Sequence, residues 1–198
     1  MFDLTGKKAL VTGASGGIGV SIAKALHAQG ATVGLHGTRE AKLQEIAEML
    51  GDRVHIFPAN LGEAESVKAL AAKAEADMEG VDILVNNAGA IPGGNLAAID
   101  EATWRTAWDL KVFGYINLCR AAYALMKERG HGTIINVTGL AADKHDFSYI
   151  AGTAGNASLN AFTRALGGYS LNDGIRVAAV SPGPVETDRL VTLMKTRS

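Results

Sequence analysis

The chain has 198 residues, of which 47% are hydrophobic and 20% charged, and its formal net charge is −1 at pH 7. This composition suits one globular domain with a substantial core, and the balanced charge gives no reason to expect nucleic acid or an anionic membrane as a partner. The single cysteine, Cys119, excludes an intrachain disulfide and a metal site built from cysteines. No apolar run approaches the ~20 residues of a membrane span, and a strand begins too soon after Met1 to leave room for a signal peptide. We therefore expect a cytoplasmic protein without a metal site.

Short apolar runs alternate with longer helical patterns along the whole chain, without a linker or an internal repeat. In chain order, strands are predicted at Ala9–Thr12, Thr32–Leu35, Val54–Phe57, Ile83–Asn86, Thr133–Val137 and Arg176–Val180. Helices are predicted at Gly17–Gln29, Glu40–Leu50, Glu63–Met78, Glu101–Glu128 and Thr153–Tyr169. Apolar runs without polar alternation are typical of parallel strands covered by helices on both faces. We predict an α/β fold over residues 1–198, a single Rossmann-type domain with a doubly wound parallel sheet and its site at the carboxyl ends of the strands.

A glycine-rich turn, residues 12–19 (Thr-Gly-Ala-Ser-Gly-Gly-Ile-Gly), joins the first strand directly to the first helix. Glycine lets the backbone turn tightly there and lets a pyrophosphate approach the helix N-terminus, whose free N–H groups attract anions. Three glycines alone are weak evidence, but their place between a strand and an amphipathic helix predicts a dinucleotide site, with a turn that binds nothing as the alternative. The candidate cofactor-binding residues in this turn are Gly13, Ser15, Gly17, Ile18 and Gly19.

The glycine spacing of this turn resembles that of the short-chain dehydrogenase/reductase family, and three further segments agree. Residues 86–89 (Asn-Asn-Ala-Gly) resemble a family motif after the fourth strand, residues 181–187 resemble the Pro-Gly loop over the nicotinamide, and residues 161–166 resemble the second half of the long fifth helix. The resemblance covers essentially the whole chain and implies NAD or NADP as cofactor and a small molecule as substrate. It adds these cofactor-binding candidates: Asn60, Leu61, Asn87, Ala88, Gly89, Pro182, Gly183, Val185 and Thr187.

The end of the second strand bears on the choice of cofactor. In the family, an acidic residue there binds the adenine ribose 2′-hydroxyl and favours NAD, whereas this chain has Leu-His-Gly-Thr-Arg at positions 35–39. Arg39 could pair with a 2′-phosphate through charge-assisted hydrogen bonds, which favours NADP over NAD. The alternative is that Arg39 is a solvated residue at the start of a helix. Asn60 stands where the family usually has an aspartate beside the adenine, and an amide can still contact that ring.

The resemblance also implies a catalytic tetrad of Asn, Ser, Tyr and Lys, and this chain lacks it. In the family, the lysine lowers the pKa of the tyrosine so that its proton can exchange near neutrality. Alignment on residues 132–138 and 161–166 places Lys111, Gly139, Gly152 and Asn156 at the four positions. Because losing a positioned acid typically costs ~10²–10⁴-fold in rate, the usual mechanism should be badly impaired.

A substitute acid/base set is available, and Lys111 and Tyr149 are the catalytic candidates. Tyr149 precedes Gly152 by three residues, about one helical turn, and Lys111 could supply the positive charge that Asn156 lacks. Lys144 and His145 could also reach the crevice. The structural alternatives are that Tyr149 is a packing or interface aromatic, that Lys111 forms a salt bridge and that His145 is solvated.

Gly152 and Gly155 lie within one predicted helical turn, where each glycine costs ~1 kcal/mol relative to alanine. They therefore predict close packing against another helix, a large ligand or a second subunit. The resemblance implies a homodimer or homotetramer formed through the two long helices, at about 104–126 and 153–169. Trp104 and Trp108 are expected on one face of the first of these helices.

Family members continue beyond the position of Ser198 with a substrate lid, a further helix and a seventh strand. We expect that region to be missing here because the chain is part of a longer protein, or else to be absent or cleaved; without it the strand at 176–180 is an exposed edge. The function expected is that of an NAD(P)(H)-dependent oxidoreductase acting on a carbonyl/alcohol pair with an atypical acid/base set. The alternatives are a catalytically silent dinucleotide-binding protein with a regulatory or scaffolding role, and a lyase, epimerase or isomerase that uses a bound cofactor without net redox change.

Overall fold

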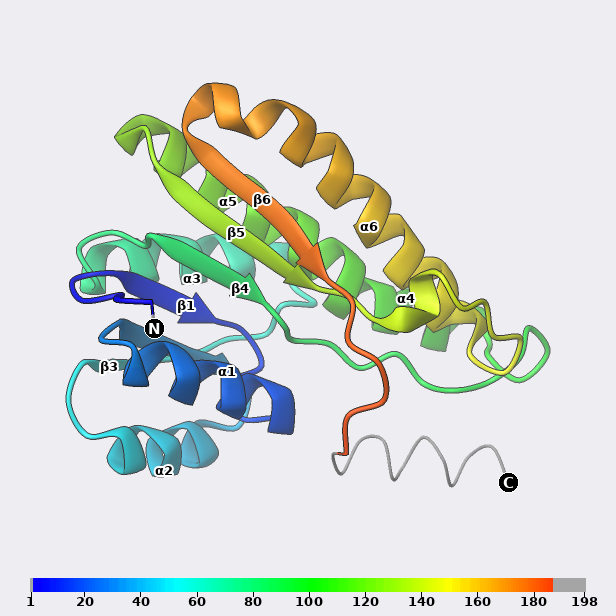
Figure 1. The fold of residues 1–198 in the computed structure, drawn as a ribbon. Coiled ribbons are helices and arrows are strands. Elements are labelled where there is room, and N and C mark those ends of the chain that lie inside the picture. The colour runs from blue at the N-terminus through cyan, green and yellow to red at the C-terminus, as the bar shows by residue number, and fades with distance from the viewer. Residues whose placement is uncertain (1, 187–198) are drawn as a thin grey trace.

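The computed structural model describes residues 2–186, and its centre is a parallel sheet of six strands. The strands are β1 (Lys8–Val11), β2 (Thr32–Gly37), β3 (Val54–Pro58), β4 (Ile83–Asn86), β5 (Gly132–Val137) and β6 (Ile175–Val180). Their spatial order is β3-β2-β1-β4-β5-β6, and every neighbouring pair is parallel. The chain therefore winds outward from β1 in both directions (Figure 1), which confirms the predicted doubly wound α/β fold.

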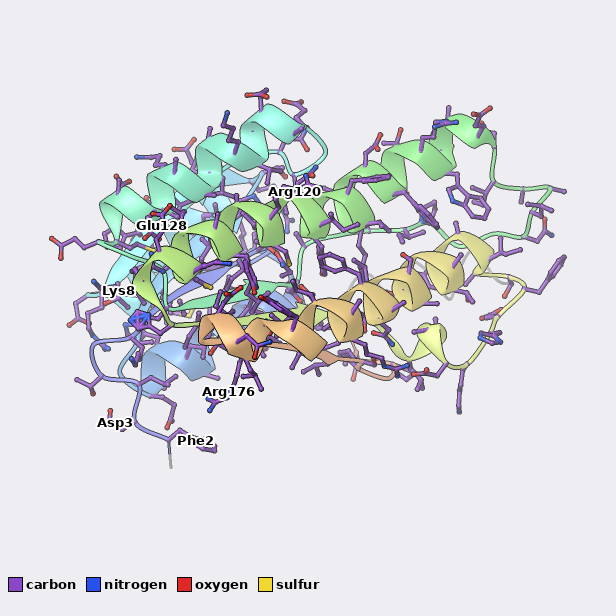
Figure 2. All side chains as sticks on the ribbon, turned by 90° about the horizontal axis from the view of Figure 1, so that it is seen from above. Phe2, Asp3, Lys8, Arg120, Glu128 and Arg176 are labelled. Carbon is purple, nitrogen blue, oxygen red and sulfur yellow. The ribbon has the colours of Figure 1, made fainter. Side chains whose placement is uncertain are left out.

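Helices cover both faces of the sheet. Helices α1 (Gly17–Ala28) and α2 (Glu40–Leu50) lie on one face, and α3 (Ala64–Asp77), α4 (Glu101–Trp108), α5 (Gly114–Arg129) and α6 (Ile150–Ser170) lie on the other. The alternation along β1 explains the two layers, because Ala9 and Val11 join the core under α1 and α2 while Leu10 joins the core under α3 and α5. Figure 2, with α3, α5 and α6 in front, shows Lys8, Glu128 and Arg176 at the amino end of the sheet, away from the site described below.

The long helix predicted at 101–128 is interrupted in its middle. Asp100 caps α4 by accepting a hydrogen bond from the Thr103 N–H at 2.7 Å. A wide π-helical turn, Asp109–Phe113, then separates α4 from α5. Such turns are rare and occur frequently at functional sites. This one carries Lys111, which is 5% exposed and points into the protein.

Buried polar side chains connect β4, β5, α5 and α6. Asn86 Nδ2 donates to Asn136 Oδ1 at 2.9 Å, and Asn136 Nδ2 donates to Thr163 Oγ1 at 2.9 Å. Cys119, which has no exposed surface, lies beside Asn86, and burial raises the pKa of its thiol to about 12. Buried hydrogen bonds of this kind fix how neighbouring elements align, although Asn86 Oδ1 itself has no hydrogen-bond partner.

Strand β6 is an edge of the sheet, as predicted. Within residues 2–186 it pairs only with β5, and Val180 is 52% exposed. A groove of about 360 Å³ lies between β6 and α6, lined by Asn160, Arg164 and Ser181 among others. In the part of the chain that the structure describes, no helix is both long enough and apolar enough to cross a membrane.

Candidate functional site

The turn between β1 and α1 is shaped by glycines that leave no room for a side chain. Gly13 has a φ of +65°, which favours glycine, and a Cβ there would lie 2.8 Å from the Ala88 Cα. A Cβ at Gly19 would overlap the Gly13 carbonyl and approach Asn87 Nδ2 to 2.8 Å. Gly13 is therefore required by the close approach of the loop after β4, and Gly19 is required first by the Gly13 carbonyl and then by Asn87.

The N-terminus of α1 is open to an anion. The helix begins at Gly17, the capping residue Gly16 supplies no side-chain hydrogen bond, and the first turn contains no acidic residue. The first N–H groups of the helix thus lack a side-chain acceptor and face the turn, where a phosphate can accept from them. Ser15 and Ile18 flank this position and are both partly exposed. The turn fits the pyrophosphate of a dinucleotide.

Thr12 ties this turn to the loop of residues 86–89. Its Oγ1 accepts from the backbone N–H groups of Asn87 at 2.9 Å and Ala88 at 3.0 Å, while Asn87 Nδ2 donates to the Thr12 carbonyl at 3.0 Å. These hydrogen bonds hold the two loops together. Thr12 was not among the predicted site residues, although a hydroxyl residue immediately before the first glycine was visible in the sequence.

Arg39 lies against the phosphate turn. Its Nη2 donates to the Ser15 carbonyl at 2.8 Å and is 3.3 Å from Ser15 Oγ, and the residue is exposed. Asn60 instead organises the turn before α3, because its Oδ1 accepts from the Gly62 N–H and its Nδ2 donates to Glu63. Leu61 is 1% exposed and packs in the core, so only its backbone can face a ligand.

His36, at the end of β2, connects the phosphate turn to β3. Its Nδ1 accepts from the Gly13 N–H at 3.4 Å, and its Nε2 is 3.1 Å from the Ala59 carbonyl, which can only accept. The ring is 2% exposed, and burial lowers its pKa to about 4 although the Ala59 hydrogen bond acts in the opposite direction. His36 is therefore neutral with its proton on Nε2. The sequence prediction missed this role, for which the signal was a histidine inside a buried apolar strand.

The segment after β6 is held against the loop after β5. Leu140 N donates to the Pro182 carbonyl at 2.9 Å, and Thr138 Oγ1 lies 2.9 Å from Ser181 Oγ. Gly183 has open space around it, and Val185 is 42% exposed. Thr187, the last cofactor-binding candidate, lies outside the described residues.

Positions 111, 139, 152 and 156 converge at the carboxyl ends of β4 and β5. Lys111 Nζ donates to the Thr138 carbonyl at 3.2 Å, and its stem lies against Gly89, where a Cβ would come within 2.8 Å of it. A Cβ at Gly139 would be 3.4 Å from Asn156 Nδ2, and Asn156 Nδ2 donates to the Gly152 carbonyl at 2.8 Å. Four residues from three separate segments thus form one cluster.

The comparisons with known proteins agree with this geometry. Residues 7–198 match the family model described as short chain dehydrogenase. The chain belongs to this family. Nodulation protein G of Rhizobium sp. (strain N33) is 48% identical over 196 residues, which are 96% of this chain and 79% of that protein. Nodulation protein G of Rhizobium meliloti (strain 1021) is 46% identical, with the same coverage.

Solved structures share the fold closely. A short chain dehydrogenase/reductase family protein superposes with a TM-score of 0.92 at 36% identity, covering 98% of this chain and 81% of that chain. The 3-ketoacyl-(acyl-carrier-protein) reductase from Brucella melitensis, solved in complex with NADH, gives a TM-score of 0.93 at 29% identity, with coverages of 97% and 81%. The chain is thus a member of a family of NAD(P)-dependent oxidoreductases.

In this short-chain dehydrogenase, Lys111 lies on the wall of the site. Its ammonium is 5.9 Å from the centroid of the Tyr115 ring, within cation–π range, and the Tyr115 hydroxyl donates to the Val137 carbonyl at 3.0 Å. Asn156 is 2% exposed, and its Oδ1 is buried without a hydrogen-bond partner. The site therefore contains a held cation and, beside it, an unsatisfied acceptor.

Tyr149 precedes α6 and lies next to Gly152. Its ring occupies the space that a Cβ at position 152 would need, and the ring atom nearest to that point is Cζ. The Tyr149 hydroxyl, which is bonded to Cζ, therefore lies close to the point where a side chain at 152 would begin. Tyr149 is 8% exposed and packs with Ile91, and a backbone bridge to Gly94 fixes it.

Close packing accounts for Gly155, the second glycine near the start of α6. A Cβ at Gly155 would lie 3.0 Å from Ile91 Cδ1 and 3.3 Å from Trp108 Nε1, so the helix that approaches is α4 of the same chain. Trp104 and Trp108 share a face as predicted, with centroids 6.0 Å apart and rings tilted by 50°. Lys144 and His145 lie in an exposed stretch. Among residues 2–186, no group of three or more His, Cys, Asp or Glu side chains is placed to hold a metal ion.

Proposed function

We propose that this short-chain dehydrogenase binds NADP in preference to NAD and interconverts a small carbonyl compound and its alcohol with an atypical acid/base set. The observation that carries the proposal is the pair Gly13 and Gly19 beside an α1 N-terminus that has no side-chain cap. This cradle would hold the pyrophosphate. The nicotinamide end would lie between the loop of residues 86–89 and the segment 181–186, at the carboxyl ends of the strands.

Arg39 supports the preference for NADP. Its guanidinium is held by the Ser15 carbonyl at the edge of the phosphate turn and remains exposed. Residues 35–38 at the end of β2 include no carboxylate that would repel a 2′-phosphate or bind a 2′-hydroxyl. A guanidinium in this place can form charge-assisted hydrogen bonds with a 2′-phosphate.

Lys111 and Tyr149 are proposed to supply the proton chemistry. When bound, the dinucleotide would supply a hydride to the carbonyl carbon or accept one from the alcohol carbon. The Lys111 ammonium, which donates to the Thr138 carbonyl, would donate a proton to the carbonyl oxygen or, as the neutral amine, take one from the alcohol. Gly139 places no side chain beside Asn156, and Tyr149, whose ring lies next to Gly152, is proposed as a second donor.

The test is turnover of NADPH with a panel of ketones and aldehydes, together with the dissociation constants for NADPH and NADH. We expect NADPH to bind more tightly, and turnover to fall by ~10²–10⁴-fold in Lys111→Met with the NADPH affinity retained. Tyr149→Phe is expected to lower turnover as well, and Tyr169→Phe, at a tyrosine that is 60% exposed near the end of α6, is the control. Unchanged turnover in Lys111→Met would overturn its catalytic role, and failure of the unmodified protein to bind either dinucleotide would overturn the proposed function.

A catalytically silent dinucleotide-binding protein is the second candidate. The feature that favours it is the absence of a hydroxyl side chain at both Gly139 and Gly152. Such a protein would bind NADPH in the same titration and consume none with any carbonyl compound. Cofactor that copurifies and stays unconsumed while a substrate is converted would instead indicate a lyase, epimerase or isomerase.

We also propose that the protein is cytoplasmic and that it forms a homodimer or homotetramer through its long helices. An exposed groove of about 480 Å³ runs along α4, lined by Leu96, Trp104, Trp108 and Phe113 among others. Apolar surface of this kind marks association sites. Light scattering of the protein and of Phe113→Glu tests the proposed oligomer. A charge in this groove should weaken the association, so the particles of the variant in solution are expected to have a lower molar mass.

A further inference from the structure

We propose that His36 is a positioning residue that sets the shape of the phosphate turn and thereby the affinity for the dinucleotide. The inference rests on the proposed dinucleotide binding, but it also makes a claim about the turn itself that does not need a ligand. The glycines shape the turn and the helix N-terminus would face the anion, but Gly13 is also held from the side of β2, by His36.

Three strand ends meet at this ring. The Gly13 N–H after β1 donates to His36 Nδ1 at 3.4 Å, and His36 Nε2–H donates to the carbonyl of Ala59 after β3 at 3.1 Å. The backbone of β2 adds two bonds, from Ala14 N–H to the His36 carbonyl at 2.8 Å and from Ala59 N–H to the Gly37 carbonyl at 3.2 Å. The side chain is thus the link between the β1 turn and the β3 turn.

The position of Gly13 matters because so much is packed against it. Gly13 has a φ of +65°, and a Cβ added to it would lie 2.8 Å from the Ala88 Cα. The Gly13 carbonyl lies against Gly19 at the start of α1. A shift of Gly13 would therefore move the helix end that faces the pyrophosphate. Preorganised N–H groups bind anions better than mobile ones, because no ordering is required on binding.

The two ring nitrogens of His36 make different hydrogen bonds, and two substitutions can remove one bond at a time. Asparagine places its carbonyl oxygen near the position of Nδ1 and can still accept from Gly13, whereas glutamine places its amide nitrogen near Nε2 and can still donate to Ala59. Each variant loses one hydrogen bond, so their losses of stability should be similar. Only His36→Gln leaves the Gly13 N–H without its acceptor.

The experiment compares His36→Asn, His36→Gln and Val33→Ala. Val33 is a fully buried residue of the same strand that packs under α1 and α2, so its truncation destabilises without removing a contact to the turn. The measurements are the dissociation constant for NADPH and the hydrogen-exchange rate of the Gly13 amide in the free protein, with melting temperatures for reference.

We expect His36→Gln to weaken NADPH binding about fivefold and to speed exchange at Gly13, in line with the loss of one hydrogen bond. His36→Asn and Val33→Ala should retain both properties. Equal effects in Asn and Gln, or unchanged Gly13 exchange in Gln, would overturn the positioning role. If the exchange pattern holds but the unmodified protein binds no dinucleotide, the positioning of the turn stands and the proposed function fails.

Discussion

The Tyr149 ring occupies the space that any side chain at position 152 would require. Gly152 and Tyr149 therefore depend on each other: the Tyr149 ring can lie beside the helix backbone only because residue 152 has no side chain. A tyrosine at 152 is incompatible with this arrangement unless Tyr149 changes as well.

Gly152→Ala should destabilise the protein, although alanine is the better helix former. The added methyl overlaps the Tyr149 ring, and overpacking of this kind typically costs about 1–3 kcal/mol. Gly168 in the same helix has nothing within 4 Å of an added Cβ, so Gly168→Ala should gain up to about 1 kcal/mol. Denaturant unfolding of both variants measures the contrast.

The double variant Tyr149→Ala/Gly152→Ala tests the coupling directly. Removing the ring opens the space for the methyl, so the cost of Gly152→Ala should largely disappear in the Tyr149→Ala background. Additive losses in this double-mutant cycle would contradict the described position of the ring.

Gly139→Ser should be well tolerated. Gly139 has an extended backbone, with φ 166° and ψ 149°, and a Cβ there lies at ordinary contact distance, 3.4 Å, from Asn156. A serine hydroxyl can donate to the buried, unpaired Asn156 Oδ1, which is worth about 1 kcal/mol. We expect Gly139→Ser to melt above Gly139→Ala, and equal melting temperatures would show that the hydroxyl does not reach this acceptor.

Arg39→Ala should weaken the binding of NADPH and leave that of NADH nearly unchanged. A hydrogen bond to a charged group contributes about 1.5–3 kcal/mol, so the loss should be roughly tenfold or more. The control is Lys42→Ala, which removes a cation from the exposed face of the neighbouring α2 helix. Equal losses for both dinucleotides would mean that Arg39 acts through Ser15 alone.

Acid should destabilise the protein through His36. Above pH 6.5 the ring is neutral in both the folded and the unfolded state, so it adds no pH dependence. Its folded-state pKa is about 4, so between pH 6.5 and pH 4 the unfolded state binds a proton that the folded state does not. Stability should fall by about 3 kcal/mol over this window. His36→Asn, which does not titrate there, should show a shallower fall in denaturant melts, and an identical fall would assign the effect to other groups.

Most of the fold was predictable because it is encoded locally. The six strands are apolar runs bounded by turn residues, and all are present with small shifts at their ends. The π-helical turn at 109–113 was not predicted, because its sequence continues the helical pattern on both sides. The start of α6 at Ile150 was also missed, since the bridge between Tyr149 and Gly94 that sets it joins residues far apart in sequence.

The candidate site likewise has a part that local sequence motifs predict and a part that depends on how distant elements pack. Gly13, Gly19 and Arg39 lie in motifs that a sequence displays directly, and the structure brings them together. The contact between Lys111 and the Thr138 carbonyl depends on how α5 approaches β5, which no local pattern states. The role of His36 likewise depends on three strand ends meeting at one ring.

The burial of Cys119 has a practical consequence. It is the only cysteine in the sequence, has no exposed surface, and its high pKa leaves little thiolate to react with alkylating agents. A single cysteine introduced at an exposed position can therefore be labelled specifically without first removing Cys119. A cysteine introduced at the exposed Ala97, on the loop that pairs with the Tyr149 segment, would carry a fluorophore beside the site and report whether that loop moves when the dinucleotide arrives.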